Sequence, residues 1–134
     1  MPAIASLLPP LLDGLSMTLR ITAGAALLAV PLALAAGLAR LSPHRWVSVP
    51  ALVYVEVFRG TSALVQLFWF YYVLPLFGLK LPAVTVGIVV LAANAGAYGA
   101  EVVRGAILAV AAGQREAAVA LNMTSGQAMR RIVL

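Results

Sequence analysis

The sequence predicts an all-α integral membrane protein with three transmembrane helices followed by a helix-turn-helix loop. Hydrophobic residues make up 63% of the 134 positions, and charged residues make up only 10%. A soluble core of this size cannot remove so much apolar surface from water. Mean hydropathy is +1.04, so we expect most apolar side chains to face lipid.

Three uncharged segments have the length of a membrane helix. They comprise 19 residues after Arg20, 20 residues after Arg59 and 20 residues after Lys80. A bilayer core requires about 20 apolar residues per helix. The predicted spans cover residues 18–41, 60–79 and 83–104. Buried helices of a soluble protein are the alternative, but so short a chain leaves no amphipathic helices to cover them.

Basic residues predict the orientation of these spans. They cluster in the first loop and near the end of the chain, at Arg40, His44, Arg45, Arg115, Arg130 and Arg131. With three spans both regions lie on one side, which the excess of positive charge marks as cytoplasmic. The N-terminus then faces outside. This pattern also explains the net charge of +5, and without a basic stripe we expect no nucleic-acid partner.

The region before the second span holds a short amphipathic segment and a repeated motif. Residues 46–56 are too few to cross a bilayer, so they are predicted to form an interfacial helix. Glu56 and Arg59 are expected to pair, in a Glu-x-x-Arg-Gly pattern that recurs at Glu101 and Arg104. Gln66 lies in an apolar run, so its amide should bond to a neighbouring helix.

The third span carries a small-residue stripe and a polar face. Small residues recur every four positions at Ala92, Gly96 and Ala100, which predicts close helix packing, either within this chain or in a dimer. Helical geometry places Asn94, Tyr98 and Glu101 in one narrow sector, with Arg104 to one side. Such a face would line a polar path and offer Arg104 to a carboxylate. Alternatively, Glu101 and Arg104 only neutralise each other at the membrane surface.

The C-terminal stretch predicts two short helices. Gly113 is expected to end the preceding helix, and Asn122 to end the next one in a left-handed conformation. Thr124 and Gln127 have capping-box spacing for a second helix. The pattern fits a cytoplasmic helix-turn-helix over 113–134 or a hairpin lying on the membrane.

Several kinds of chemistry have no residues to support them. The chain has no cysteine and a single histidine, His44, with no second ligand nearby, so no metal site is predicted. The sequence contains no recognisable pairing of a nucleophile with a base, so it is not predicted to be an enzyme. The G-x-x-x-x-G-K-[ST] phosphate loop is also missing, so energy for any active process would come from another chain.

The C-terminal motif resembles a known family. Glu116-Ala117-Ala118, followed at fixed spacing by Ile132-x-Leu134, resembles the EAA loop of ABC-importer permeases. The segments 54–61, 64–67, 94–98 and 113–116 resemble the polar amino-acid (histidine, glutamine and arginine type) uptake subfamily. Asn122 replaces the family's Gly, Ser62 replaces its Pro, and the chain stops where the motif's next Pro would stand. We therefore expect 1–134 to be the N-terminal part of a permease transmembrane domain.

The resemblance implies a role for three sets of residues. Those expected to couple to an ATPase are Gly113, Gln114, Glu116, Ala117, Ala118, Asn122, Ile132 and Leu134. Those expected along a substrate path are Asn94, Tyr98, Glu101 and Arg104. Those matching the second-helix signature are Glu56, Arg59, Gly60, Thr61 and Gln66.

The implied function is an ATP-driven importer of polar amino acids or related small polar solutes in the bacterial inner membrane. The implied partners are a cytoplasmic ABC ATPase, an identical or homologous permease, a periplasmic or lipid-anchored substrate-binding protein and the lipid bilayer. ATP and Mg²⁺ would sit on the ATPase, so no cofactor is expected on this chain. The alternatives are a small secondary transporter or channel without an ATPase, and a truncated membrane interaction protein that does not transport.

Overall fold

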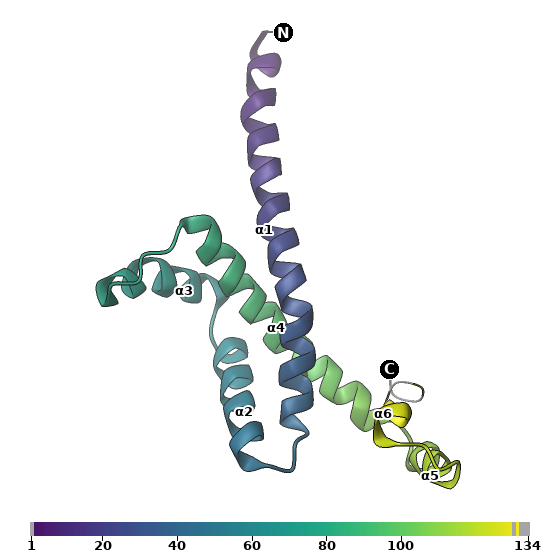
Figure 1. Cartoon of the computed structure of the whole chain (residues 1–134). Helices are drawn as coiled ribbons and strands as arrows, with labels where there is room; N and C mark the ends of the chain where they lie inside the picture. Colours follow the sequence, from purple (N-terminus) through teal and green to yellow (C-terminus); the bar gives the residue numbers. More distant parts are fainter. Residues whose placement is uncertain (1, 130, 132–134) are drawn as a thin grey trace.

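The computed structural model describes residues 2–129 and 131, and within them the chain is helical with short connections (Figure 1). The elements in order are α1 (Pro2–Arg40), α2 (Arg45–Gly60), α3 (Ala63–Phe68), the π-helical η1 (Trp69–Val73), the 3-10 helix η2 (Leu74–Phe77), α4 (Ala83–Ala109), α5 (Ala112–Ala120) and α6 (Ser125–Ala128). The predicted all-α membrane fold is confirmed.

Two of these helices are long and apolar enough to cross a membrane. They are Leu8–Arg40, with 33 residues, and Ala83–Ala109, with 27 residues. Both extend beyond the predicted spans 18–41 and 83–104, because hydropathy locates an apolar core but not the ends of a helix. Large apolar side chains of the first half of α1, such as Leu11 and Leu19, are exposed, as expected for a surface that meets lipid.

The second predicted span, 60–79, contains the helical segment Ala63–Phe77, which is made of α3, η1 and η2. The break after Gly60 falls at the predicted start of this span, and the segment beyond it lies at an angle of 104° to α2. Thr61 and Ser62 adopt extended backbone conformations at the break. A sequence window records that residues 60–79 are apolar, but it does not give the angle at which they leave α2, which becomes possible because a side-chain amide replaces the helical hydrogen bonds lost at the break. The segment predicted as an interfacial helix belongs to α2.

The helices α1 and α4 cross in close contact through small residues. On α1 the buried positions are Ala25, Ala29, Ala33 and Ala36. A methyl group added at Gly99 of α4 would lie 2.7 Å from the Ala33 Cβ, and one at Gly37 of α1 would lie 2.9 Å from the Ala100 carbonyl oxygen. The two backbones are therefore as close as their glycines allow.

This contact decides between the two interpretations of the small-residue stripe. Ala92, Gly96 and Ala100 are all buried, and a Cβ on Gly96 would lie 2.9 Å from the Leu32 Cβ and 3.0 Å from the Tyr54 hydroxyl. The stripe packs against α1 and α2 of the same chain, so it is not available as a dimer surface.

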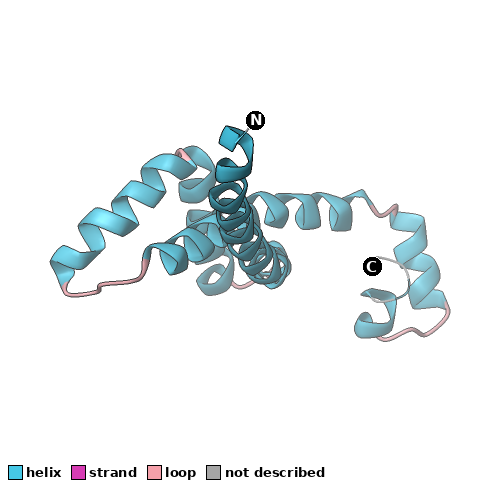
Figure 2. Cartoon of the chain, turned by 90° about the horizontal axis from the view of Figure 1, so that it is seen from above, coloured by secondary structure: helices cyan, strands magenta, loops and turns pink. Residues whose placement is uncertain are grey.

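The helix α2 completes this core from a third side. Val55 is fully buried and clusters with Ala36 and Ala100, with Tyr54 packed against them. The Tyr54 hydroxyl donates a hydrogen bond of 2.6 Å to the Ala93 carbonyl. Viewed along α1, the end of α4 and the α5–α6 hairpin extend away to one side of this core (Figure 2).

We predict that Gly99→Ala lowers the free energy of unfolding by about 1–3 kcal/mol, because the new methyl group overlaps Ala33. The matched control is Gly105→Ala on the same helix, where an added Cβ meets no atom within 4 Å. That control should be neutral or slightly stabilising, since Ala favours helix. Thermal unfolding in detergent, followed by tryptophan fluorescence, measures both. Equal melting temperatures for the two variants would contradict the proposed close contact.

Candidate functional site

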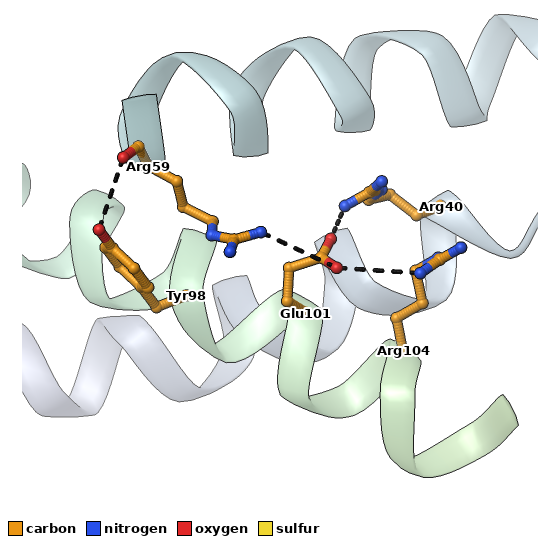
Figure 3. Close-up of polar contacts among 5 residues, drawn as sticks. All are labelled: Arg40, Arg59, Tyr98, Glu101 and Arg104. Carbon is orange, nitrogen blue, oxygen red and sulfur yellow. Dashed lines mark hydrogen bonds and ion pairs between the residues drawn. The ribbon is translucent and has the colours of Figure 1, made fainter. Parts of the chain in front are cut away.

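One carboxylate, that of Glu101 on α4, faces three arginines from three helices (Figure 3). Arg40, at the end of α1, forms an ion pair with Glu101 Oε1 through its Nη1 atom. The Nη1 atom of Arg59, at the end of α2, lies 3.9 Å from Glu101 Oε2. Arg104, one turn further along α4, places its Nη1 atom 3.8 Å from the same Oε2. Glu101 is thus an ionic junction of α1, α2 and α4.

The four side chains differ in their exposure. The side chain of Arg40 is 13% exposed and that of Glu101 is 25% exposed. The side chains of Arg59 and Arg104 are 38% and 37% exposed. Arg40 and Glu101 therefore form an inner pair, while Arg59 and Arg104 lie at its open side. The cluster carries three positive charges and one negative charge.

Tyr98 holds Arg59 in place at the edge of this cluster. The Arg59 guanidinium carbon lies 5.4 Å from the centroid of the Tyr98 ring, a cation–π distance. The Tyr98 hydroxyl donates to the Arg59 carbonyl oxygen at 3.5 Å, as Figure 3 also shows. About half of Tyr98 remains exposed, so the ring orients Arg59 without covering it.

The structure corrects one predicted ion pair and confirms another. Arg59 does not pair with Glu56 but extends to Glu101, and Glu56 has no ion pair among the described residues. The reason is that α2 packs through Tyr54 and Val55, which leaves Glu56 on its exposed side. The Glu101–Arg104 pair is present. Sequence reasoning missed Arg40, because no local spacing relates residues 61 positions apart.

An uncharged network occupies the break between α2 and α3. Gln66 is buried, and its Nε2 donates to Thr61 Oγ1 at 2.6 Å and to the Phe58 carbonyl at 3.0 Å. Asn94 Nδ2 on α4 donates to Gln66 Oε1 at 3.2 Å and to the Phe58 carbonyl at 3.0 Å. The predicted bond from Gln66 to a neighbouring helix is confirmed. The amides supply the hydrogen bonds that the broken helix lacks.

The structure shows where two sets of predicted site residues lie. The second-helix signature, Glu56, Arg59, Gly60, Thr61 and Gln66, lies at the end of α2 and the break that follows it. In the predicted substrate path, Tyr98, Glu101 and Arg104 share the ionic cluster. The amide of Asn94, in contrast, is engaged in the network at the break.

The C-terminal hairpin has the two predicted helix signals. Asn122 has a φ of 53°, in the left-handed region. The Met123 N–H donates to the Ala118 carbonyl at 3.0 Å, as in a Schellman-type helix end. Thr124 N–H donates to Gln127 Oε1 at 3.0 Å, and Gln127 N–H donates to Thr124 Oγ1 at 3.4 Å, which completes the capping box.

One boundary of this hairpin differs from the prediction. The helix α4 ends at Ala109 and Val110 is extended, so Gly113 does not end that helix but lies in the first turn of α5. Gly113, Gln114, Glu116 and Ala117 are exposed, and Ala118 is buried. Ile132 and Leu134 lie outside the described residues.

Residues 29–134 match the family described as "Binding-protein-dependent transport system inner membrane component". The chain belongs to this family. It is 44% identical over 133 residues to the probable amino-acid ABC transporter permease protein y4tF of Sinorhizobium fredii, covering 95% of this chain and 56% of that protein. It is 36% identical over 134 residues to the glutamine transport system permease protein GlnP of Escherichia coli, covering 98% and 61%.

A solved structure has the same fold. It is the crystal structure of an amino acid ABC transporter with histidines, which this chain matches at a TM-score of 0.88 with 40% identity. The match covers 98% of this chain and 62% of the solved chain. This member of the transport family therefore spans between about half and two thirds of the length of the proteins it resembles.

For the ionic junction of this family member, we predict that Glu101→Gln lowers the free energy of unfolding by about 3 kcal/mol, because three guanidinium groups lose their carboxylate. Glu56→Gln, in the other copy of the motif, is the matched control and should change stability by less than about 0.5 kcal/mol. The double variant Arg40→Gln/Glu101→Gln should recover part of the loss. Thermal unfolding measures all three, and equal effects at Glu101 and Glu56 would contradict the junction.

For the hairpin, we predict that Asn122→Val destabilises the α5 end by about 1–2 kcal/mol, because a β-branched residue disfavours a φ of 53°. Asn122→Gly should retain it or stabilise it slightly. Hydrogen exchange of the Leu121 and Met123 amides, which bond back into α5, measures the difference. Faster exchange in the glycine variant than in the valine variant would exclude this account.

Proposed function

We propose that the chain acts as a membrane permease subunit of an ATP-driven importer for polar amino acids or related small polar solutes. Its family is the membrane component of binding-protein-dependent transport. Relatives are named as permeases for glutamine and, in Bacillus subtilis, for L-cystine and arginine. These names supply the substrate class of the proposal.

The observation that carries the proposal is the exposed hairpin at the end of α4. The α5 surface presents Glu116 and Ala117 to solvent, and its turn is fixed locally by Asn122 and by the Thr124–Gln127 cap. A short rigid helix with an exposed acid is suited to dock in a cleft of a separate protein. We infer that this partner is a cytoplasmic ABC ATPase, which would bind ATP and Mg²⁺.

The remaining assembly follows from the same proposal. An identical or homologous permease would form the second half of the translocation path, and a periplasmic or lipid-anchored binding protein would deliver the solute. The hairpin would lie in the cytoplasm and the N-terminus outside the inner membrane. The α4 face with Tyr98, Glu101 and Arg104 would line the path, as Asn94 would if the network at the break opens.

We predict that Glu116→Ala uncouples ATP hydrolysis from uptake, with a loss of roughly tenfold or more in transport, because a charged docking contact is removed. The assay reconstitutes the permease with its ATPase and binding protein in proteoliposomes and measures solute uptake together with ATP hydrolysis. The matched control is Asp13→Ala, which removes an exposed acid of α1, outside the hairpin.

Unchanged uptake and unchanged ATPase stimulation in Glu116→Ala would refute the docking role. Co-purification tests the assembly itself. A stable complex with an ATP-binding chain excludes a secondary transporter or channel, whereas uptake without any such chain would overturn the ATP-driven importer.

A further inference from the structure

The guanidinium groups of Arg59 and Arg104 have donors left over. Their Nη1 atoms lie 3.9 and 3.8 Å from Glu101 Oε2, within ion-pair range but beyond a hydrogen bond. Both approach the same oxygen, while Oε1 is taken by Arg40. Each guanidinium has five N–H donors, so one shared carboxylate oxygen leaves most of them free.

The cluster also has a surplus of two positive charges. Within the described part of the chain, the other acids are Asp13, Glu56 and Glu116, which are exposed and take part in no ion pair. Helix α4 is long and apolar enough to span the membrane, and unmatched charges within a span are costly. Two of the three positive charges of the cluster therefore have no anion of their own, and a second anion would offset part of this surplus.

The geometry selects the kind of anion. Arg59 and Arg104 come from different helices and meet at one point, with more than a third of each side chain exposed. Planar guanidinium groups bind the two oxygens of a carboxylate in matching pairs. Tyr98, half exposed, fixes the direction of Arg59, and the Glu101 carboxylate lies between Arg59 and Arg104 (Figure 3).

We propose that Arg59 and Arg104 form a binding site for the carboxylate group of the transported solute. The assignment rests on the proposed import function and adds to it a requirement: a solute must carry a free carboxylate to pass this point. Arg40 and Glu101 are positioning residues for this site. The arriving carboxylate offsets one of the two surplus charges and accepts hydrogen bonds that Glu101 cannot accept at these distances.

The first test measures binding without transport. The purified permease, with its ATPase, is placed in phosphatidylcholine nanodiscs, and thermal unfolding is followed in sodium acetate and in sodium chloride of equal ionic strength. A ligand bound to the native state raises the melting temperature. We expect acetate to stabilise the wild-type protein and Arg45→Gln, an exposed arginine of α2 without an ion pair among the described residues. Arg59→Gln/Arg104→Gln should weaken acetate binding by roughly tenfold or more.

Several outcomes would overturn the assignment. Equal stabilisation by acetate and chloride, or equal acetate effects in the double variant and Arg45→Gln, means there is no carboxylate site. Stronger stabilisation by inorganic phosphate than by acetate assigns the site to a phosphate group instead. Loss of the acetate effect when phosphatidylglycerol is added to the nanodiscs assigns it to a lipid headgroup. The Arg40–Glu101 pair is left unchanged in every variant, and the melting temperature in sodium chloride checks that each variant folds.

The second test measures transport in proteoliposomes with the binding protein present. Arg59→Gln and Arg104→Gln should each lower amino-acid uptake by about tenfold. Uptake equal to that of Arg45→Gln would refute the site. If the wild-type complex imports no amino acid but acetate still binds through Arg59 and Arg104, the import function fails and the anion site remains.

Discussion

The close crossing of α1 and α4 is the constraint on which the rest of the structure depends. Lipid is as apolar as the side chains, so burial alone does not drive two membrane helices together. Close backbone contact does, and it requires the alanines of α1 and the glycines at positions 37, 96 and 99. The same contact fixes how far each helix slides along the other. That register brings Arg40, the last residue of α1, to Glu101.

Two polar clusters build on this register, and they differ in how completely their groups are paired. At the break after α2, the amides of Gln66 and Asn94 bond to each other and to the Phe58 carbonyl. That cluster is neutral and partly buried, so it supports structure. The cluster around Glu101 has more cations than anions and keeps Arg59 and Arg104 exposed. Ionisable residues within a membrane span are costly, so an excess of positive charge there is typical of a functional site.

The predictable parts of this protein are those that depend on neighbours in sequence. Apolar length located α1 and α4, three-residue spacing gave the Glu101–Arg104 pair, and the Thr124–Gln127 cap was read from a four-residue pattern. The boundary at Gly60 follows from the sequence, but the 104° angle across it does not, because that angle depends on an amide six residues ahead and on another in α4. Arg40 was missed because its partner is set by helix register, which no single segment encodes. Spacing predicted that Asn94 shares a face of α4 with Tyr98 and Glu101. Only tertiary contacts show that the Asn94 amide joins the network at the break and not the ionic cluster around Glu101.

The position of the ionic junction along α4 connects the two regions of functional interest. The hairpin has its own turn and caps, and it follows α4 in the chain through Val110 and Ala111. Glu101 lies eight residues before the end of α4 at Ala109, about 12 Å along the helix axis. Under the proposed function, an ATPase that displaces the hairpin would first move the end of α4 at Ala109. The contacts of Glu101 with Arg40 and Arg59 cross to other helices, so they are the first ionic contacts that such a displacement would strain. A shift of α4 relative to α2 changes the separation of Arg59 and Arg104, and with it the affinity of the site for a carboxylate.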